Sequence, residues 1–153
     1  MIHVLIPSNF KADSLHCLPE LSEIFPGLPL KVIFFHAFGL SSSITELLML
    51  SRRTKEEELV SSRFTSLCRQ AQQEGDWVQA IEHTWFYGTT MAAFKNFLNA
   101  NEISFIAVPA NFRHQALGKL SQNPMLFLEK CGLPVIAVAP RVPKAVQVLE
   151  KAG

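Results

Sequence analysis

The sequence predicts an α/β fold, a three-layer doubly wound arrangement in which five parallel strands form one sheet with helices on both faces. Nearly continuous apolar runs, typical of strands buried on both faces, alternate along the chain with amphipathic segments of helical periodicity. The chain has 153 residues, of which 48% are hydrophobic, so it can bury the core of one such domain and disorder is excluded. We expect this domain to span residues 1–140, followed by a C-terminal extension over residues 141–153.

Five segments have the composition of strands. The first is rich in β-branched residues and stops where Pro7, Ser8 and Asn9 interrupt the apolar run. The third alternates between apolar and polar residues, which places it nearer an edge of the sheet. The predicted strands cover residues 2–6, 30–38, 77–87, 103–108 and 133–139.

The segments between the strands carry helix signals. Asp13 or Ser14 is predicted to cap a first helix, which Pro19 should kink because an interior proline removes a hydrogen bond. The run Thr54-Lys55-Glu56-Glu57 has the spacing of a capping box and is predicted to open a long helix that ends at Gly75.

Two shorter helices are predicted further along the chain. Residues 91–98 follow a Gly88-Thr89-Thr90 turn, and residues 126–128 belong to a helix that Gly132 ends. Residues 39–53 contain three serines and then an apolar cluster, a composition that fits either a short helix or a mobile cover over a sheet edge.

Charge and composition exclude several classes of function. A net charge of +1 gives no basic surface for nucleic acid or an anionic membrane. No apolar run approaches the roughly 20 residues that a membrane span needs, and the first residues lack the features of a signal peptide. The three cysteines are isolated in the sequence and fit small buried side chains of a reducing compartment. We therefore expect a cytoplasmic protein with no nucleic-acid or membrane partner.

The sequence carries no recognisable catalytic or metal-binding motif. It has no nucleophile elbow, Walker loop or dinucleotide-binding glycine motif. His3 and His36 fall on neighbouring strands of the expected sheet, but a third metal ligand is missing, so hydrogen-bonded structural roles are favoured. We predict no catalytic residues and no metal site. A ligand would bind beyond the carboxyl ends of the strands where the strand order reverses, near residues 7–10 and 109–113.

Several segments, taken in order and spacing, resemble the universal stress protein family. The run Ile6-Pro7-Ser8-Asn9-Phe10, followed by Ser14-Leu15, is similar to the first strand, loop and helix of that family. Phe34-Phe35-His36-Ala37 is similar to the end of its second strand, and Leu133-Pro134-Val135-Ile136-Ala137-Val138 is similar to its last strand. The resemblance extends from residue 1 to about residue 140.

The resemblance implies an adenine nucleotide alpha hydrolase-like fold with the strand order 3-2-1-4-5. It also implies a homodimer formed through the fifth strand, from Val135 to Ala139. Members that bind ATP carry an Asp after the first strand and a Gly-x2-Gly-x9-Gly-Ser/Thr loop after the fourth. By this resemblance Asn9 stands at the Asp position, and Ala37 stands where the backbone lies beside the adenine.

The phosphate loop of this chain departs from the pattern of the ATP-binding members. Pro109 and Phe112 stand at the first two glycines, and Ser121 and Gln122 lie nearest the final Gly-Ser, with a spacing one residue short. Glycine lets backbone N–H groups approach phosphate oxygens, whereas Pro109 has no N–H and Phe112 adds bulk. One cation, Arg113, remains in the loop. The chain therefore resembles a member with a degenerate ATP-binding loop, and ATP is disfavoured as a cofactor.

The favoured function is that of a cytoplasmic stress or regulatory protein that is not catalytic and does not bind ATP tightly. The alternative is a nucleotide-binding module or weak ATPase with a rebuilt phosphate loop that uses Asn9 and Arg113. A third option, an enzyme on a related α/β fold, has no catalytic constellation to support it. The residues that would line a degenerate pocket follow the carboxyl ends of the strands: Pro7, Ser8, Asn9, Ala37, Val108, Pro109, Asn111, Phe112, Arg113, Ser121 and Gln122.

Overall fold

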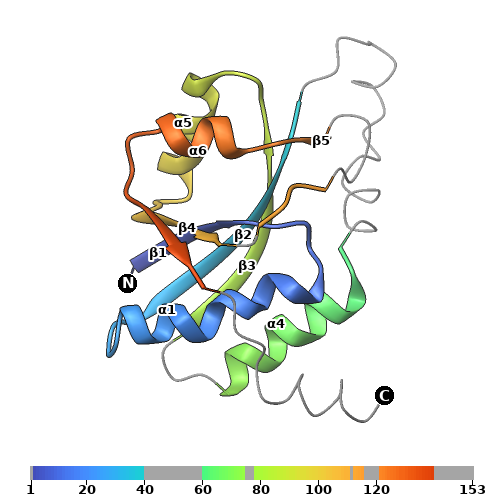
Figure 1. Ribbon diagram of the computed structural model, residues 1–153, viewed down its shortest axis with the longest axis vertical. Coiled ribbons are helices and arrows are strands. Elements are labelled where there is room, and N and C mark those ends of the chain that lie inside the picture. The colour runs from blue at the N-terminus through green and yellow to red at the C-terminus, as the bar shows by residue number, and fades with distance from the viewer. Residues whose placement is uncertain (1, 40–59, 75–77, 111, 116–120, 140–153) are drawn as a thin grey trace.

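A parallel sheet with helices on both faces forms the centre of the computed structural model (Figure 1), which describes residues 2–39, 60–74, 78–110, 112–115 and 121–139. The strand order is β3-β2-β1-β4-β6. With β6 as the fifth predicted strand, this confirms the predicted fold class and strand order. The parallel strands of the sheet are β1 (Ile2–Pro7), β2 (Leu30–Phe38), β3 (Val78–Tyr87), β4 (Phe105–Pro109) and β6 (Val135–Val138).

The central strands differ in length, and this difference positions the site described below. β1 pairs with β2 from Ile2 opposite Leu30 to Pro7 opposite Phe35. β2 continues to Phe38, and its pairing with β3 continues with it. The last three residues of β2 therefore extend beyond the end of β1, with one backbone edge that β1 does not cover.

A sixth, antiparallel strand covers that edge. β5 consists of Ser121 and Gln122, with Gln122 opposite Ala37 and Ser121 opposite Phe38 of β2. The sequence analysis did not predict this strand, because two polar residues show no alternation that distinguishes a strand from a loop. Only the free edge of β2 gives these residues their hydrogen-bonding partners.

Two hydrophobic clusters lie on opposite faces of the sheet. A short 3₁₀ helix (Ala12–Cys17), α1 (Leu18–Ile24) and α4 (Ser62–Glu74) cover one face, and α5 (Met91–Ala100) and α6 (Met125–Lys130) cover the other. The first cluster joins sheet residues to Leu15, Leu18, Leu21 and Phe64, and the second joins them to Phe94, Leu98 and Leu128.

Two helix predictions are wrong in their details. Pro19 lies in the first turn of α1, where no interior hydrogen bond is lost, so the expected kink is absent from this helix. The helix predicted to open at Thr54 does not run continuously to Gly75, because Val60 and Ser61 are not helical. Instead α4 begins at Ser62, and the N–H of Phe64 donates to Ser61 Oγ at 2.9 Å. Residues 40–59, which include the predicted capping box and most of the undecided segment, lie outside the described residues.

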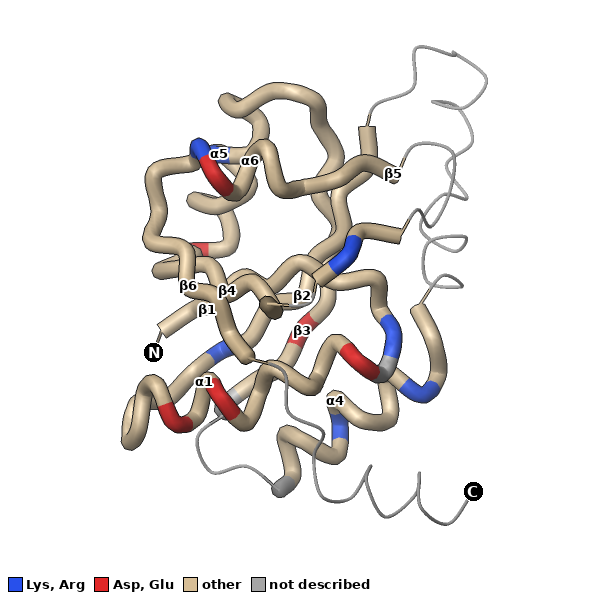
Figure 2. The backbone as a smooth tube through the Cα atoms, viewed as in Figure 1, with Lys and Arg blue, Asp and Glu red and all other residues tan. Residues whose placement is uncertain are grey.

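Charged side chains are dispersed over the described part of the chain. Figure 2 shows Lys and Arg interspersed with Asp and Glu on several elements. One ion pair joins β2 to β3, with Lys31 Nζ 3.2 Å from Glu82. Among the described residues no helix is both long enough and apolar enough to cross a membrane.

Phe10 connects the end of β1 to the core. It adopts a left-handed backbone conformation with φ of 56°, which is uncommon for a bulky side chain, and its N–H donates to Ser8 Oγ at 2.9 Å. The Phe10 ring is fully buried, with its centroid 4.7 Å from that of Trp85 and 5.6 Å from that of Phe64. Aromatic pairs at such distances add to the stabilisation that burial itself provides.

We expect Phe10→Ala to lower the free energy of unfolding by about 3–5 kcal/mol, since it empties a fully buried aromatic site. Urea denaturation followed by circular dichroism measures this change. Leu126→Ala is the matched control, because Leu126 on α6 is 69% exposed and should change the free energy by no more than about 0.5 kcal/mol. Equal effects of the two substitutions would contradict the assigned role of Phe10.

Candidate functional site

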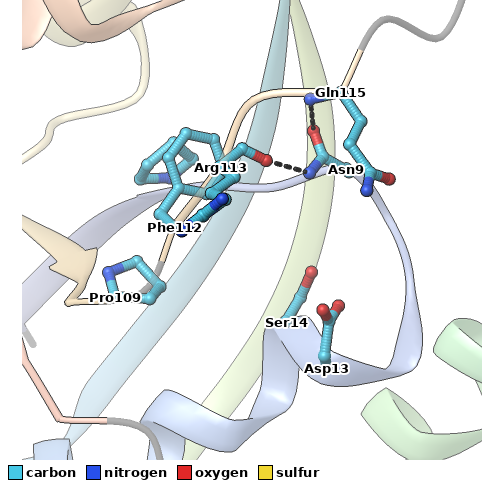
Figure 3. A pocket seen from close by; sticks show the side chains of 8 residues that line it. Asn9, Asp13, Ser14, Pro109, Phe112, Arg113 and Gln115 are labelled. Atoms are coloured by element: carbon cyan, nitrogen blue, oxygen red, sulfur yellow. Dashed lines mark hydrogen bonds between the residues drawn. The ribbon is translucent and has the colours of Figure 1, made fainter.

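The candidate site lies where the strand order reverses, between the carboxyl ends of β1 and β4. The loops that leave these strands enclose a small cavity of about 190 Å³ (Figure 3). In doubly wound sheets this is the place where ligands bind. The cavity is lined by two prolines, one aromatic ring and five polar or charged side chains, which are Pro7, Pro109, Phe112, Asn9, Asp13, Ser14, Arg113 and Gln115.

Asn9 ties the two loops together. Its Nδ2 donates to the carbonyl oxygen of Arg113 at 2.9 Å, and the N–H of Gln115 donates to its Oδ1 at 3.1 Å (Figure 3). Lys11 adds a second tie, because its Nζ donates to Oε1 of Gln115 at 2.6 Å. Both ends of the Asn9 amide are therefore engaged by the loop that follows β4.

The loop after β4 also satisfies its own backbone groups. The N–H of Phe112 donates to the carbonyl oxygen of Pro109 at 2.9 Å, which closes a tight turn. The N–H of Ala110 donates to the carbonyl oxygen of Val138 at 2.8 Å. Neither N–H group points freely into the cavity as an anion-binding donor would.

His36, on β2, is hydrogen-bonded on both sides of its ring. Nδ1 lies 2.8 Å from the carbonyl oxygen of Ser8, and Nε2 is hydrogen-bonded to Ser121 Oγ on β5. A carbonyl oxygen can only accept, so Nδ1 carries the proton. Burial lowers the pKa of His36, although the bond to Ser8 opposes this shift, so the neutral ring accepts the Ser121 proton at Nε2.

A second histidine stacks on the first. The rings of His36 and His114 are nearly parallel, with an interplanar angle of 23° and a centroid separation of 5.2 Å. Burial also lowers the pKa of His114. Within the described residues, Nδ1 of His114 is buried without a hydrogen-bond partner. Two neutral rings can share this position, whereas two imidazolium ions would repel one another.

Some of the predicted site residues line the cavity, and others lie outside it, several of them where β5 pairs with β2. Pro7, Asn9, Pro109, Phe112 and Arg113 line the cavity. The others do not line it: Ser8 is buried, Val108 belongs to β4, and Ala37, Ser121 and Gln122 take part in the pairing between β2 and β5. Asn111 lies outside the described residues.

Sequence reasoning missed three cavity residues and one contact between rings. Asp13 and Ser14 showed only a helix-capping signal, and Gln115 showed none. The approach of His114 to His36 depends on the loop after β4, for which periodicity says nothing.

His3 and His36, which the sequence left open as a conceivable metal pair, are each engaged by other groups. Nδ1 of His3 lies 3.0 Å from the carbonyl oxygen of Asn101, whereas His36 bonds to Ser8 and Ser121. The described part of the chain contains no cluster of three or more metal-ligating side chains. His3 and His36 therefore each have hydrogen-bonding partners of their own.

Two of the three cysteines have poorly reactive thiols. All three are free, and burial raises the pKa of both Cys17 and Cys68 to about 12. A thiol with so high a pKa holds almost no thiolate near neutral pH, so it is a poor nucleophile.

Comparison with known proteins identifies the fold. Neither a scan against protein-family models nor a search of the curated proteins found a match. Among solved structures, the hypothetical protein PH0823 matches with a TM-score of 0.54 and 17% identity, covering 94% of this chain and 98% of that one. The hypothetical protein MJ0577 matches with a TM-score of 0.54 and 14% identity, covering 93% and 98%.

A third solved structure has a descriptive name. The universal stress protein UspA from Lactobacillus plantarum matches with a TM-score of 0.52 and 15% identity, covering 90% of this chain and 97% of that one. This chain has the universal stress protein fold. In this chain the candidate site lies at the reversal of strand order between β1 and β4, and the short strand β5 pairs with β2.

The stacked histidines predict a stability that depends on pH. Because folding lowers the pKa of His36 and of His114, the unfolded chain binds protons first as the pH falls. The free energy of unfolding should therefore be highest above about pH 7 and decrease below the ordinary histidine pKa of 6.5. His114 is the titratable side chain in ring contact with His36, and the other ring contacts of His36 are to Phe10 and Phe38.

We expect His114→Asn to reduce this loss, since it removes one titrating group and its repulsion of His36. Urea denaturation of both proteins between about pH 5 and pH 8 provides the comparison. The values at about pH 8, where both rings are neutral, serve as the internal reference for the cost of the substitution itself. An identical decrease in both proteins would contradict the prediction.

Proposed function

We propose that this protein is a cytoplasmic stress-response regulator with the universal stress protein fold that does not bind ATP tightly. One observation carries the proposal: the groups at the candidate site are already bonded within the protein. The N–H of Phe112 donates to Pro109, and the amide of Asn9 is engaged by Arg113 and Gln115. The free thiols support a reducing compartment.

The phosphate side of the site lacks its usual donors. Pro109 has no N–H, and the N–H of Phe112 is already donated within the turn. Each charge-assisted hydrogen bond to phosphate contributes roughly 1.5–3 kcal/mol, so the loss of two weakens binding by a factor on the order of 10² or more. The shortage of donors on the phosphate side therefore supports the absence of a tight ATP site.

The other side of the site is also obstructed. The resemblance places the adenine beside the backbone of Ala37, but in this chain Ala37 pairs with Gln122 of β5. Nε2 of Gln122 also donates to the carbonyl oxygen of Gly88, which anchors β5. The remaining cavity of about 190 Å³ is smaller than the roughly 300–1,000 Å³ of typical small-molecule pockets.

The alternative function, a rebuilt nucleotide site that uses Asn9 and Arg113, finds less support. Asn9 would have to release two hydrogen bonds to the loop before its amide could recognise a purine. A ligand would then have to compensate for the loss of those bonds as well as for the missing phosphate donors.

Calorimetric titration with ATP and magnesium tests the proposal. We expect no micromolar binding by the natural sequence. The double substitution Pro109→Gly and Phe112→Gly should tighten binding by about tenfold or more, because it restores one N–H and removes a bulky side chain. Asn9→Asp serves as the matched control: it places a carboxylate oxygen opposite the carbonyl oxygen of Arg113 and should not restore binding. Micromolar binding by the natural sequence would establish the nucleotide-binding alternative.

We also propose that the protein is a homodimer formed through the last strand. β6 lies at the end of the strand order and pairs with β4 on one side. Val135 and Ala137 on this strand are exposed, Val135 to 46%. An apolar edge strand tends to associate with another strand unless it is covered, which supports this interface.

We expect Val135→Lys to convert a dimer into a monomer, because it places a charge in the proposed interface at a position that is exposed in the single chain. Light scattering at a protein concentration of about 10–50 μM measures the molar mass, and this range is far above the Kd of a stable dimer. Leu28→Lys is the matched control, since Leu28 is 43% exposed and precedes β2, which β1 and β4 separate from β6. A monomeric natural sequence would overturn the proposed dimer.

A further inference from the structure

We propose that Ser121 is a reactive nucleophile for which His36 serves as the general base. This chemistry goes beyond the regulatory function proposed above and does not depend on it. The two residues are 85 positions apart in the sequence, and the pairing of β5 with β2 brings them together. The substrate class is an activated acyl ester, such as an aryl ester, whose leaving group departs without a proton.

The hydrogen bonds run from Ser121 to His36 and from His36 to the Ser8 carbonyl, which is the sequence of contacts that nucleophilic catalysis requires. Ser121 Oγ is hydrogen-bonded to Nε2 of His36, and Nδ1 of the same ring bonds to the carbonyl oxygen of Ser8 at 2.8 Å. A nucleophile, a base and a group that orients the base are the three parts of an activated hydroxyl. Here a backbone carbonyl takes the place of the carboxylate found in the common triads.

The proton positions follow from the acceptor at Nδ1. Because the Ser8 carbonyl can only accept, the proton of the neutral ring lies on Nδ1 and the lone pair lies on Nε2. Ser121 then donates its hydroxyl proton to that lone pair. This is the direction of proton transfer that turns a hydroxyl into a nucleophile.

The surroundings enclose the base more completely than the nucleophile. His36 is only 2% exposed, and its ring contacts those of Phe10, Phe38 and His114 at centroid distances between 5.1 and 6.1 Å. Ser121 is half-buried rather than buried. A ring fixed by packing on several sides holds the orientation that an efficient base needs.

The proposed reaction balances with water as the second reactant. In the first step a bond forms between Ser121 Oγ and the ester carbonyl carbon, and the hydroxyl proton passes to Nε2 of His36. The bond to the aryl oxygen breaks, the arylate leaves with the electron pair, and His36 returns its proton to the solvent. In the second step His36 deprotonates an attacking water, and the same proton then passes to Oγ as the acid departs.

A fluorophosphonate probe tests for this nucleophile in the full chain. Attack by Oγ forms a phosphorus–oxygen bond and expels fluoride, and mass spectrometry of the intact chain and of its peptides locates the adduct. We expect the natural sequence to be labelled at Ser121 and Ser121→Ala not to be labelled. Ser22→Ala is the matched control and should be labelled normally, because Ser22 is also part-buried but donates to the carbonyl oxygen of Pro19 at 2.6 Å.

The variant His36→Asn tests the role of the base while the fold is retained. Its amide nitrogen can still donate to the Ser8 carbonyl, but it offers no base to Ser121. We expect labelling to slow by roughly 10²–10⁴-fold, the usual contribution of a general base, while circular dichroism shows the native fold.

The pH dependence of labelling in the natural sequence tests the same base without any substitution, and it applies even if that variant does not fold. The labelling rate should be constant above about pH 7, since the pKa of His36 lies below its ordinary value and the base is already neutral there. His114, stacked on His36, is the titratable side chain in ring contact with it. A serine without a base would instead react faster as hydroxide increases.

Three results would overturn the proposal. They are the absence of an adduct at Ser121, equal labelling rates for His36→Asn and the natural sequence, and a rate that rises steadily between about pH 7 and pH 10. Any of them would show that the bond between Ser121 and His36 only anchors β5.

Discussion

The early end of the central strand determines the arrangement at the carboxyl side of the sheet. β1 stops at Pro7, opposite Phe35, whereas β2 continues to Phe38. The last ladder bond on this side is the one from the N–H of Ser8 to the carbonyl oxygen of Phe35. Beyond it, the edge of β2 that faces away from β3 would lack hydrogen-bonding partners, a state that costs free energy. β5 supplies those partners, so the short antiparallel strand is a consequence of where β1 ends.

The turn that follows β1 serves several purposes with few residues. The hydroxyl of Ser8 accepts the N–H of Phe10, and its carbonyl accepts Nδ1 of His36. The ring of Phe10 is thereby directed into the aromatic cluster around Trp85 and Phe64. Asn9, which lies between Ser8 and Phe10 in the sequence, hydrogen-bonds to the loop after β4. Core packing and the geometry of the candidate site thus depend on the same three consecutive residues.

Local signals predicted the elements better than their boundaries and contacts. Apolar runs identified four of the five parallel strands, because a strand buried on both faces needs an almost uninterrupted apolar sequence. The third strand was identified instead by its partial alternation of apolar and polar residues. Helix beginnings were less certain, since capping signals occur at more than one position. Ser61 caps α4, which begins at Ser62, although Thr54 has the better capping-box spacing. The 3₁₀ turn before α1 places Pro19 in a first turn, where proline is tolerated.

The sequence by itself determined the fold class, the strand order expected from the resemblance, and the position of the site at the ends of β1 and β4. It also determined that position 109 offers no backbone N–H, because the chemistry of Pro109 does not depend on its neighbours. Only the tertiary structure decided which distant residues meet at the carboxyl ends of the strands. The pairing of β5 with β2 and the approach of His36 to Ser121 join segments 85 residues apart. Such contacts arise from the unequal lengths of two neighbouring strands, which no local periodicity encodes.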